Sequence, residues 1–122
     1  MEDYTLKAES SLSSLKALYS DGKSPLLNLT GQTSDIELIE PIAEYFCENF
    51  NDIIILGTGG SSLGGQTICA LNDNTKPLNP TLHFMDNIDP DSFNCLFRSI
   101  TPEQTGFIVI SKSGNTAETL TQ

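Results

Sequence analysis

Three short apolar runs between residues 52 and 110 constrain the fold of the chain more than any other feature. They are Asp52–Leu56, Thr81–Met85 and Phe107–Ile110. Each run is too short for a buried helix, is bounded by turn residues, and is separated from the next by a segment with helical spacing. This alternation predicts βαβ units around a buried parallel sheet, which is an α/β fold.

Two segments beside these runs carry apolar residues at helical intervals. The first set is Ile36, Ile39, Ala43, Phe46 and Phe50, and the second is Phe93, Leu96, Phe97 and Ile100. Ser34 or Asp35 is available to cap the first helix, and Pro41 either kinks that helix or marks its true start. Asp89 and Pro90 supply a cap and a first-turn proline for the second helix.

The beginning of the chain has a different character. Its one weak helical stripe consists of Leu6, Leu12, Leu15 and Leu18. We therefore interpret residues 1–33 as an amino-terminal extension and residues 34–122 as the folded domain. A chain of 122 residues with 38% apolar and 18% charged residues has the size and composition of one globular domain.

The charge balance excludes several classes of partner. Six Lys and Arg against sixteen Asp and Glu give a net charge of -10, which repels nucleic acid and anionic membrane surfaces. No apolar stretch is long enough to span a bilayer. The three cysteines, Cys47, Cys69 and Cys95, are odd in number and widely spaced, which is unlike a disulfide framework or a metal site. We expect a cytoplasmic protein with neither metal nor cofactor.

The first candidate site is the glycine-rich segment that follows the first run, Gly57–Gly65. A strand that enters glycines and leaves into a helix presents free amides and the positive end of a helix dipole. Ser61 and Ser62 add hydroxyl donors, so the segment is typical of a phosphate site. A dinucleotide fingerprint would need glycine at Ser62, and the Gly-Lys-Ser/Thr of a P-loop is absent. The alternative is a tight strand-to-helix turn with no ligand.

The second candidate site follows the third run and covers Ser111–Leu120. Its hydroxyls come from Ser111, Ser113 and Thr116, and Lys112 supplies one of the six positive charges. The alternative is a capped helix, with Asn115 as the cap and Glu118 completing a capping box. The two readings are compatible, because caps and anions use the same unpaired amides.

The two segments are more informative together than separately. In a flavodoxin-like strand order the first and third strands are neighbours, and ligands bind in the crevice between their carboxyl ends. Both loops are therefore expected to face a single phosphate group.

At these residues the sequence resembles the glucose-6-phosphate isomerase family. The segment Gly57–Gly64 is similar to the glycine signature of that family, and Ser111–Thr119 is similar to its Ser-Lys-Thr-x-Thr-Thr-x-Glu-Thr phosphate loop. Between them, Asn87–Asp89 resembles the Asn-Ile/Val-Asp of the family. The three motifs span Asp52 to Gln122 and occur in the family's order.

The resemblance implies a three-layer, flavodoxin-like sugar isomerase (SIS) domain of which only the first part is present. It implies that Gly60 and Ser61 border the sugar phosphate. It assigns the phosphate oxygens to the second loop, namely to Ser111, Lys112, Ser113, Gly114, Asn115 and Thr116. Within that loop, Gly114 and Asn115 depart from the family pattern toward the Ser-x-Ser-Gly-x-Thr of the wider sugar isomerase domain family. Glu118 matches an acidic residue that the family keeps near the sugar, with a solvated helix residue as the alternative.

The implied activity is the interconversion of glucose 6-phosphate and fructose 6-phosphate in glycolysis and gluconeogenesis, by a homodimer that needs no cofactor. The family's catalytic glutamate, histidine, lysine and arginine come from later in a longer chain, and His83 is instead expected to be a packed core or edge residue. We therefore expect a fragment truncated after Gln122 and inactive alone. The alternatives are a non-catalytic module that binds sugar phosphates and regulates a partner, or another phosphosugar isomerase, such as one for amino sugars or mannose phosphate.

Overall fold

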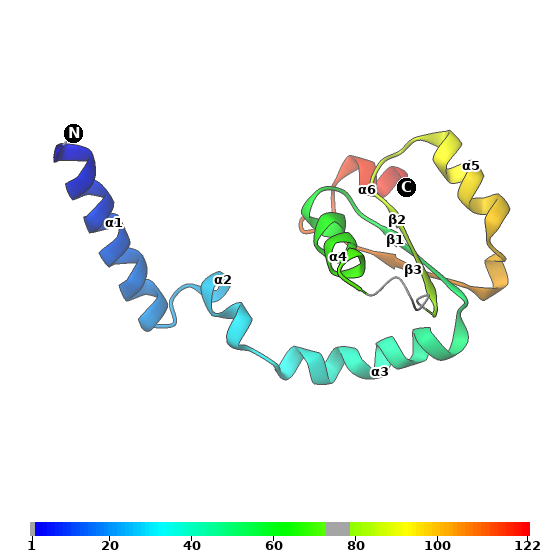
Figure 1. Ribbon diagram of the computed structural model, residues 1–122, viewed down its shortest axis with the longest axis horizontal. Helices are drawn as coiled ribbons and strands as arrows, with labels where there is room; N and C mark the ends of the chain where they lie inside the picture. The colour runs from blue at the N-terminus through cyan, green and yellow to red at the C-terminus, as the bar shows by residue number, and fades with distance from the viewer. Residues whose placement is uncertain (1, 73–78) are drawn as a thin grey trace. The chain divides into compact units, whose positions relative to one another are not determined.

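A computed structural model describes residues 2–72 and 79–122 (Figure 1). The chain forms two compact units, Met1–Pro41 and Ile42–Gln122, and the division falls inside helix α3 (Ser34–Asn49). The first unit contains α1 (Glu2–Ser20), α2 (Pro25–Asn28) and the short helix η1 (Leu29–Gly31). The leucines of α1 are 44 to 66% exposed, so their stripe is not the inner face of a core in this unit. None of the helices in the described ranges is long and apolar enough to cross a membrane.

The second unit is an α/β structure. After α3 its elements are β1 (Asp52–Leu56), α4 (Gly60–Ala70), β2 (Thr81–Met85), α5 (Pro90–Ser99), η2 (Pro102–Gln104), β3 (Thr105–Val109) and α6 (Ala117–Thr121). The strands form a parallel sheet in the order β2-β1-β3. The predicted fold class and the predicted neighbouring of the first and third strands are both confirmed.

The central strand, β1, supplies the core. Its isoleucines and leucine point alternately to the two faces of the sheet, and none of Ile53 to Leu56 is more than 9% exposed. Helix α5 covers one of these faces. The residues that pack together there are Ile54, Leu56, Met85, Leu96 and Ile100, with Phe93 at the margin. A run of β-branched residues buried on both sides is what a parallel sheet with helices on both faces requires.

The opposite face is covered by α4 and by the second half of α3. Glycines let these helices come close: a Cβ atom on Gly65 would lie 2.8 Å from the ring of Phe84, and one on Gly106 would lie 2.8 Å from the ring of Phe46. Figure 1 shows α4 and α5 on the two sides of the sheet. The unit therefore has the three layers that we predicted.

Three local predictions change. Strand β3 begins at Thr105, two residues before the predicted run, because Thr105 and Gly106 are buried although neither is a large apolar residue. Pro41 lies inside α3 and does not mark its start. Phe97 is 51% exposed, because only one side of α5 lies on the sheet.

The apolar face predicted for α3 is also partly wrong. Phe46 and Phe50 pack near Gly106, whereas Ile36 and Ile39 are 57 and 56% exposed. These two isoleucines precede the sheet unit, and no described layer covers them.

Candidate functional site

The loops after β1 and β3 start side by side. Leu56, the last residue of β1, pairs with both Met85 and Val109, so all three strands end at one edge of the sheet. The amide of Ile110 donates to the carbonyl of Leu56 over 2.9 Å, which extends the pairing into the loops. A Cβ atom on Gly57 would lie 2.9 Å from the carbonyl oxygen of Ile110. Only a glycine lets the two backbones approach this closely.

The first loop turns sharply into α4. Gly59 has φ +55° and ψ -124°, a conformation that disfavours any side chain, and α4 begins at Gly60. The amides of Ser61 and Ser62 are already bonded to the carbonyls of Thr58 and Gly59, at 3.2 and 3.0 Å. The amides of Thr58, Gly59 and Gly60 have no backbone partner among the described residues, so Gly60 is one of the donors that this turn leaves open.

The prediction that Ser62 offers its hydroxyl to a ligand is wrong. Ser62 is fully buried, and its hydroxyl oxygen accepts a 2.7 Å hydrogen bond from Nε2 of Gln66. Its neighbour Ser61 is only partly buried. Because successive residues of a helix point about 100° apart, one serine faces the interior and the other the loop edge.

The second loop is closed on itself by hydroxyl groups. The Oγ of Ser111 lies 3.0 Å from Oγ1 of Thr116 and accepts a 3.0 Å hydrogen bond from the amide of Gly114. The Oγ of Ser113 lies 3.4 Å from Oγ1 of Thr116 and accepts from the amide of Asn115 at 3.2 Å. Gly114 has φ +72°, the left-handed conformation that this tight closure needs. Three hydroxyls and two amides are thus gathered in six residues.

The capped-helix alternative for this loop is wrong in detail. The residue before α6 is Thr116, not Asn115, and no side chain caps the helix. Glu118 lies in the first turn with an exposed side chain. Lys112 is also exposed and forms no ion pair with any residue in the described ranges, so its charge is open to solvent at the loop.

The segment after β2 is a helix cap, as predicted. The carboxylate of Asp89 accepts hydrogen bonds from the amide and the hydroxyl of Ser92, at 2.9 and 2.7 Å. These bonds from the side chain and the backbone of Ser92 lower the pKa of Asp89 below its ordinary value of 3.8. Asn87 adds a second local contact, because its Oδ1 accepts from the amide of Asp89 at 2.9 Å.

Two glutamines near these loops were missed by the sequence interpretation. Nε2 of Gln66 donates to Asp86 at 3.3 Å as well as to Ser62, and Nε2 of Gln122 donates to the carbonyls of Met85 and Asn87 at 3.0 and 2.9 Å. Oε1 of Gln122 is buried without a hydrogen-bond partner among the described atoms. A polar residue at the inner face of a helix is the only signal that could have indicated them.

His83 lies midway along the edge strand β2, where it pairs with Ile54. Its Nε2 is 2.7 Å from Oδ1 of Asp52, the first residue of β1. It is therefore an edge histidine, as expected, and its ring contacts the end of β1 opposite to the one where the first loop begins. The structure places no cluster of three metal-ligating side chains within the described ranges, and Cys47, Cys69 and Cys95 are free.

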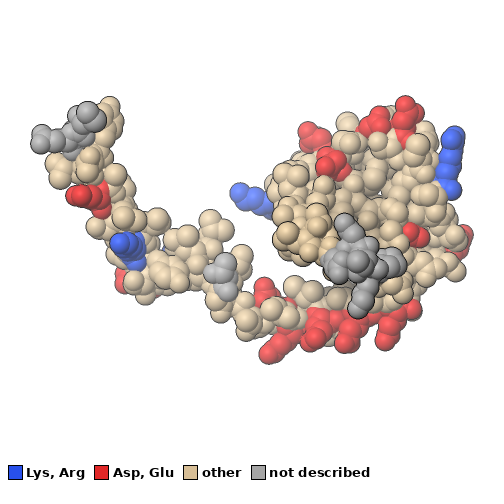
Figure 2. Space-filling view, in the orientation of Figure 1, with Lys and Arg blue, Asp and Glu red and all other residues tan. Residues whose placement is uncertain are grey.

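Charge is distributed unevenly over the second unit. Figure 2 shows acidic side chains along α3, whose part within this unit carries Glu44 and Glu48. Arg98 and Lys112 are the basic side chains described in this unit, and the two basic groups seen there in Figure 2 lie far apart. Positive charge is thus sparse, and Lys112 is the part of it that lies on a candidate loop.

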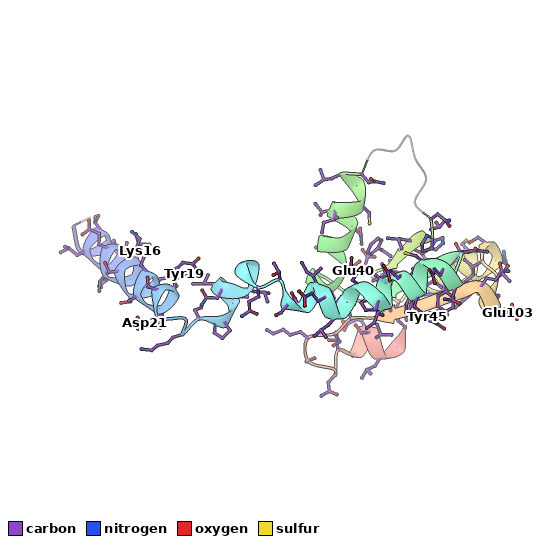
Figure 3. The ribbon with its side chains drawn as sticks, turned by 90° about the horizontal axis from the view of Figure 1, so that it is seen from below. Lys16, Tyr19, Asp21, Glu40, Tyr45 and Glu103 are labelled. Atoms are coloured by element: carbon purple, nitrogen blue, oxygen red, sulfur yellow. The ribbon has the colours of Figure 1, made fainter. Side chains whose placement is uncertain are left out.

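The first unit contains a hollow that the sequence did not indicate. It has a volume of about 410 Å³ and is lined by Leu15, Lys16, Tyr19, Ser20 and Leu27. Figure 3 shows Lys16 and Tyr19 together on α1. The hollow is open and mostly apolar, with one ammonium group at its wall, and it is unlike the polar loops of the second unit.

The fold and the two loops define a class of protein. It is an α/β chain whose parallel sheet presents two helix-preceding loops at one carboxyl edge, as ligand-binding doubly wound sheets do. The profile of the family described as phosphoglucose isomerase matches residues 14–122. The chain belongs to the phosphoglucose isomerase family.

Individual relatives agree with this assignment. The glucose-6-phosphate isomerase of Carboxydothermus hydrogenoformans is 35% identical over 131 aligned residues, which cover 100% of this chain and 28% of the relative. The probable glucose-6-phosphate isomerase of Haloquadratum walsbyi is 38% identical over 77% of this chain and 21% of its own length. That of Borreliella burgdorferi is 40% identical over 59% of this chain and 14% of its own. The chain thus spans less than a third of the length of these relatives.

Proposed function

We propose that this chain supplies the phosphate-binding part of a glucose-6-phosphate isomerase, and that the loops 57–64 and 111–116 bind the phosphate of a hexose 6-phosphate together. The observation that carries the proposal is the meeting of the two loops at the sheet edge, where the amide of Ile110 bonds to Leu56. Loops joined in this way present their donors to the same small volume.

The chemistry of the loops suits a phosphate. The amide of Gly60 and the amides at the start of α6 are donors without helical partners. The hydroxyls of Ser111, Ser113 and Thr116 bond to one another and to loop amides, so they are already gathered in one place. A bound phosphate would accept hydrogen bonds from these groups in place of the bonds within the loop. Lys112 adds the positive charge.

Proton transfer between adjacent sugar carbons needs groups that these loops do not contain. Glu118 is the one carboxylate in the two loops and their helix starts, and His83 is engaged with Asp52 at the far end of the strands. We therefore propose that this chain binds substrate phosphate and that catalysis needs further groups. Isomerase turnover by the 122-residue chain in a coupled assay would contradict this part of the proposal.

Calorimetry with 6-phosphogluconate tests the binding assignment. The double variant Ser111→Ala plus Thr116→Ala removes the hydroxyl pair that closes the second loop, and we expect binding at least about tenfold weaker. The matched control is Thr67→Ala plus Ser99→Ala, whose hydroxyls bond to carbonyls of their own helices and which should bind as the wild type does. Equal affinity in the two double variants would refute the loop assignment.

A further inference from the structure

The helix that leaves each candidate loop is hydrogen-bonded to a different residue or residues of one short segment, 85–87. From α4, Gln66 reaches the carboxylate of Asp86. From the end of α6, Gln122 reaches the carbonyls of Met85 and Asn87. The segment 85–87 begins with the last residue of β2 and lies outside both loops, yet one side-chain amide from α4 and one from the end of α6 donate to it.

These contacts connect parts of the chain that are distant in sequence. Gln66 and Asp86 are 20 residues apart, and Gln122 is 35 and 37 residues from its two acceptors. The two loops are otherwise joined through the backbone at Leu56 and Ile110, near their beginnings. The glutamines add a second connection through the helices, since Gln66 lies in the middle of α4 and Gln122 directly follows the last residue of α6.

The hydrogen bonding of Gln122 is expected to affect the placement of loop 111–116 more than the free energy of unfolding. Its Nε2 donates to two carbonyls, but its Oε1 is buried with no partner among the described atoms. A buried unpaired acceptor costs free energy that offsets much of what the two donated bonds contribute. The net contribution of the side chain to global stability is therefore small, although its two hydrogen bonds join the end of α6 to segment 85–87.

We propose that Gln122 is a positioning residue of the phosphate site, which holds loop 111–116 at a fixed distance from segment 85–87, while Gln66 holds the glycine loop to the same segment. This inference rests on the proposed function. Gln122 touches no substrate in this account, and it acts through the placement of Ser111 to Thr116.

The test compares two glutamines at opposite ends of the sheet. Gln122→Met keeps the length of the side chain and removes its donors and its unpaired acceptor. The control is Gln104→Met, since Oε1 of Gln104 accepts a 2.7 Å bond from Asn51 at the amino-terminal end of the strands. With 6-phosphogluconate we expect Gln122→Met to bind about five- to tenfold more weakly and Gln104→Met less than about twofold more weakly. The thermal midpoints of the two variants should agree.

A second readout needs no ligand. In the ¹⁵N-labelled chain, Gln122→Met should move the amide signals of residues 111–116 as well as those of 85–87, and Gln104→Met should move neither. If the wild-type chain binds no 6-phosphogluconate, the proposed function fails, and these signals still decide whether Gln122 positions the loop. Should Gln122→Met not fold, Gln122→Asn, which is too short to reach both carbonyls, takes its place.

Three results would overturn the inference. The first is wild-type affinity in Gln122→Met. The second is a set of shifts confined to residues 85–87, which would show that Gln122 satisfies local hydrogen bonds without placing the loop. The third is a loss of affinity in Gln122→Met together with a thermal midpoint clearly below that of Gln104→Met, which would assign Gln122 a purely structural role.

Discussion

The two loops at the carboxyl edge of the sheet are built by opposite means. The loop after β1 depends on missing side chains: Gly57 lies against the carbonyl of Ile110, and Gly59 takes a conformation that side chains disfavour. The loop after β3 depends on side chains that are present, because Ser111, Ser113 and Thr116 bond to its backbone and to one another. Changes to Gly57 and Gly59 of the first loop should therefore alter mainly folding, and changes to the hydroxyls of the second loop should alter mainly binding.

The largest effect is expected at Gly57. A Cβ atom there meets the backbone oxygen of Ile110 at 2.9 Å and the Cβ of Ser61 at 3.0 Å, so Gly57→Val forces two strand ends apart. We expect a loss of about 3 kcal/mol in the free energy of unfolding, measured by urea denaturation. Gly64→Ala is the control, because its Cβ meets nothing within 4 Å and alanine favours α4 by up to about 1 kcal/mol. Wild-type stability in Gly57→Val would contradict the claim that the first loop requires glycine at this position.

Each candidate loop contains one glycine with positive φ, and these two glycines allow a like-for-like test of the loops. A Cβ atom at Gly59 or Gly114 meets nothing within 4 Å, so alanine at either position costs only backbone strain, about 1 to 2 kcal/mol. Both variants should lower the urea midpoint, and Gly114→Ala should also weaken phosphate binding, because Gly114 carries an amide of the hydroxyl network. A Gly114→Ala chain with wild-type stability would show that the network does not impose the turn.

The adjacent serines of the first loop sharpen the comparison within a single turn of helix. Ser62→Ala removes a buried acceptor of Gln66 and should cost about 1 kcal/mol of stability. Ser61→Ala should change stability by less than about 0.5 kcal/mol and should weaken binding. Denaturation and calorimetry on both variants check this division, and a reversal of the two effects would contradict it.

The smallest effect on stability is expected in the loop after β2, where Asp89 caps α5. This loop serves as a reference for the other two. Because hydrogen bonds to Ser92 lower the pKa of Asp89 in the folded chain, its charged form contributes stability above the ordinary carboxyl value of 3.8. That contribution is lost as the pH falls through the lower folded pKa. Asp89→Asn keeps the capping oxygen and removes the titration. The stability difference between wild type and Asp89→Asn should therefore vanish at low pH, and a difference that grew on acidification would contradict the assignment.

Much of the fold was predictable because its signals are local. Ile53 to Leu56 are apolar on both faces, which only a covered parallel strand satisfies, and Asp89 with Pro90 marks the start of α5 by elementary capping chemistry. The early start of β3 was not predictable in this way. Gly106 belongs to the strand because the rings of Phe46 and Phe50 pack where its side chain would be, and that is a contact between distant segments.

In the candidate site, too, the features with local signals were predictable and those that depend on distant contacts were not. Its two loops were predicted from glycines and hydroxyls that stand directly after strands, and the structure brings them to one edge. The interior position of Ser62, the cap at Thr116 and the reach of Gln122 to Met85 depend on the rotation of helices about their axes and on tertiary packing. Spacing along the chain does not determine either of these.

The central claim is that both loops form one phosphate site, and a titration of the ¹⁵N-labelled chain with 6-phosphogluconate tests it most directly. If both loops bind one phosphate, the amide signals of Gly60, Ser61 and residues 111–116 will move along a single binding curve with one dissociation constant. The signal of Gln104, at the opposite end of the strands, should stay in place. Movement of only one loop, or two curves with different constants, would contradict a shared site.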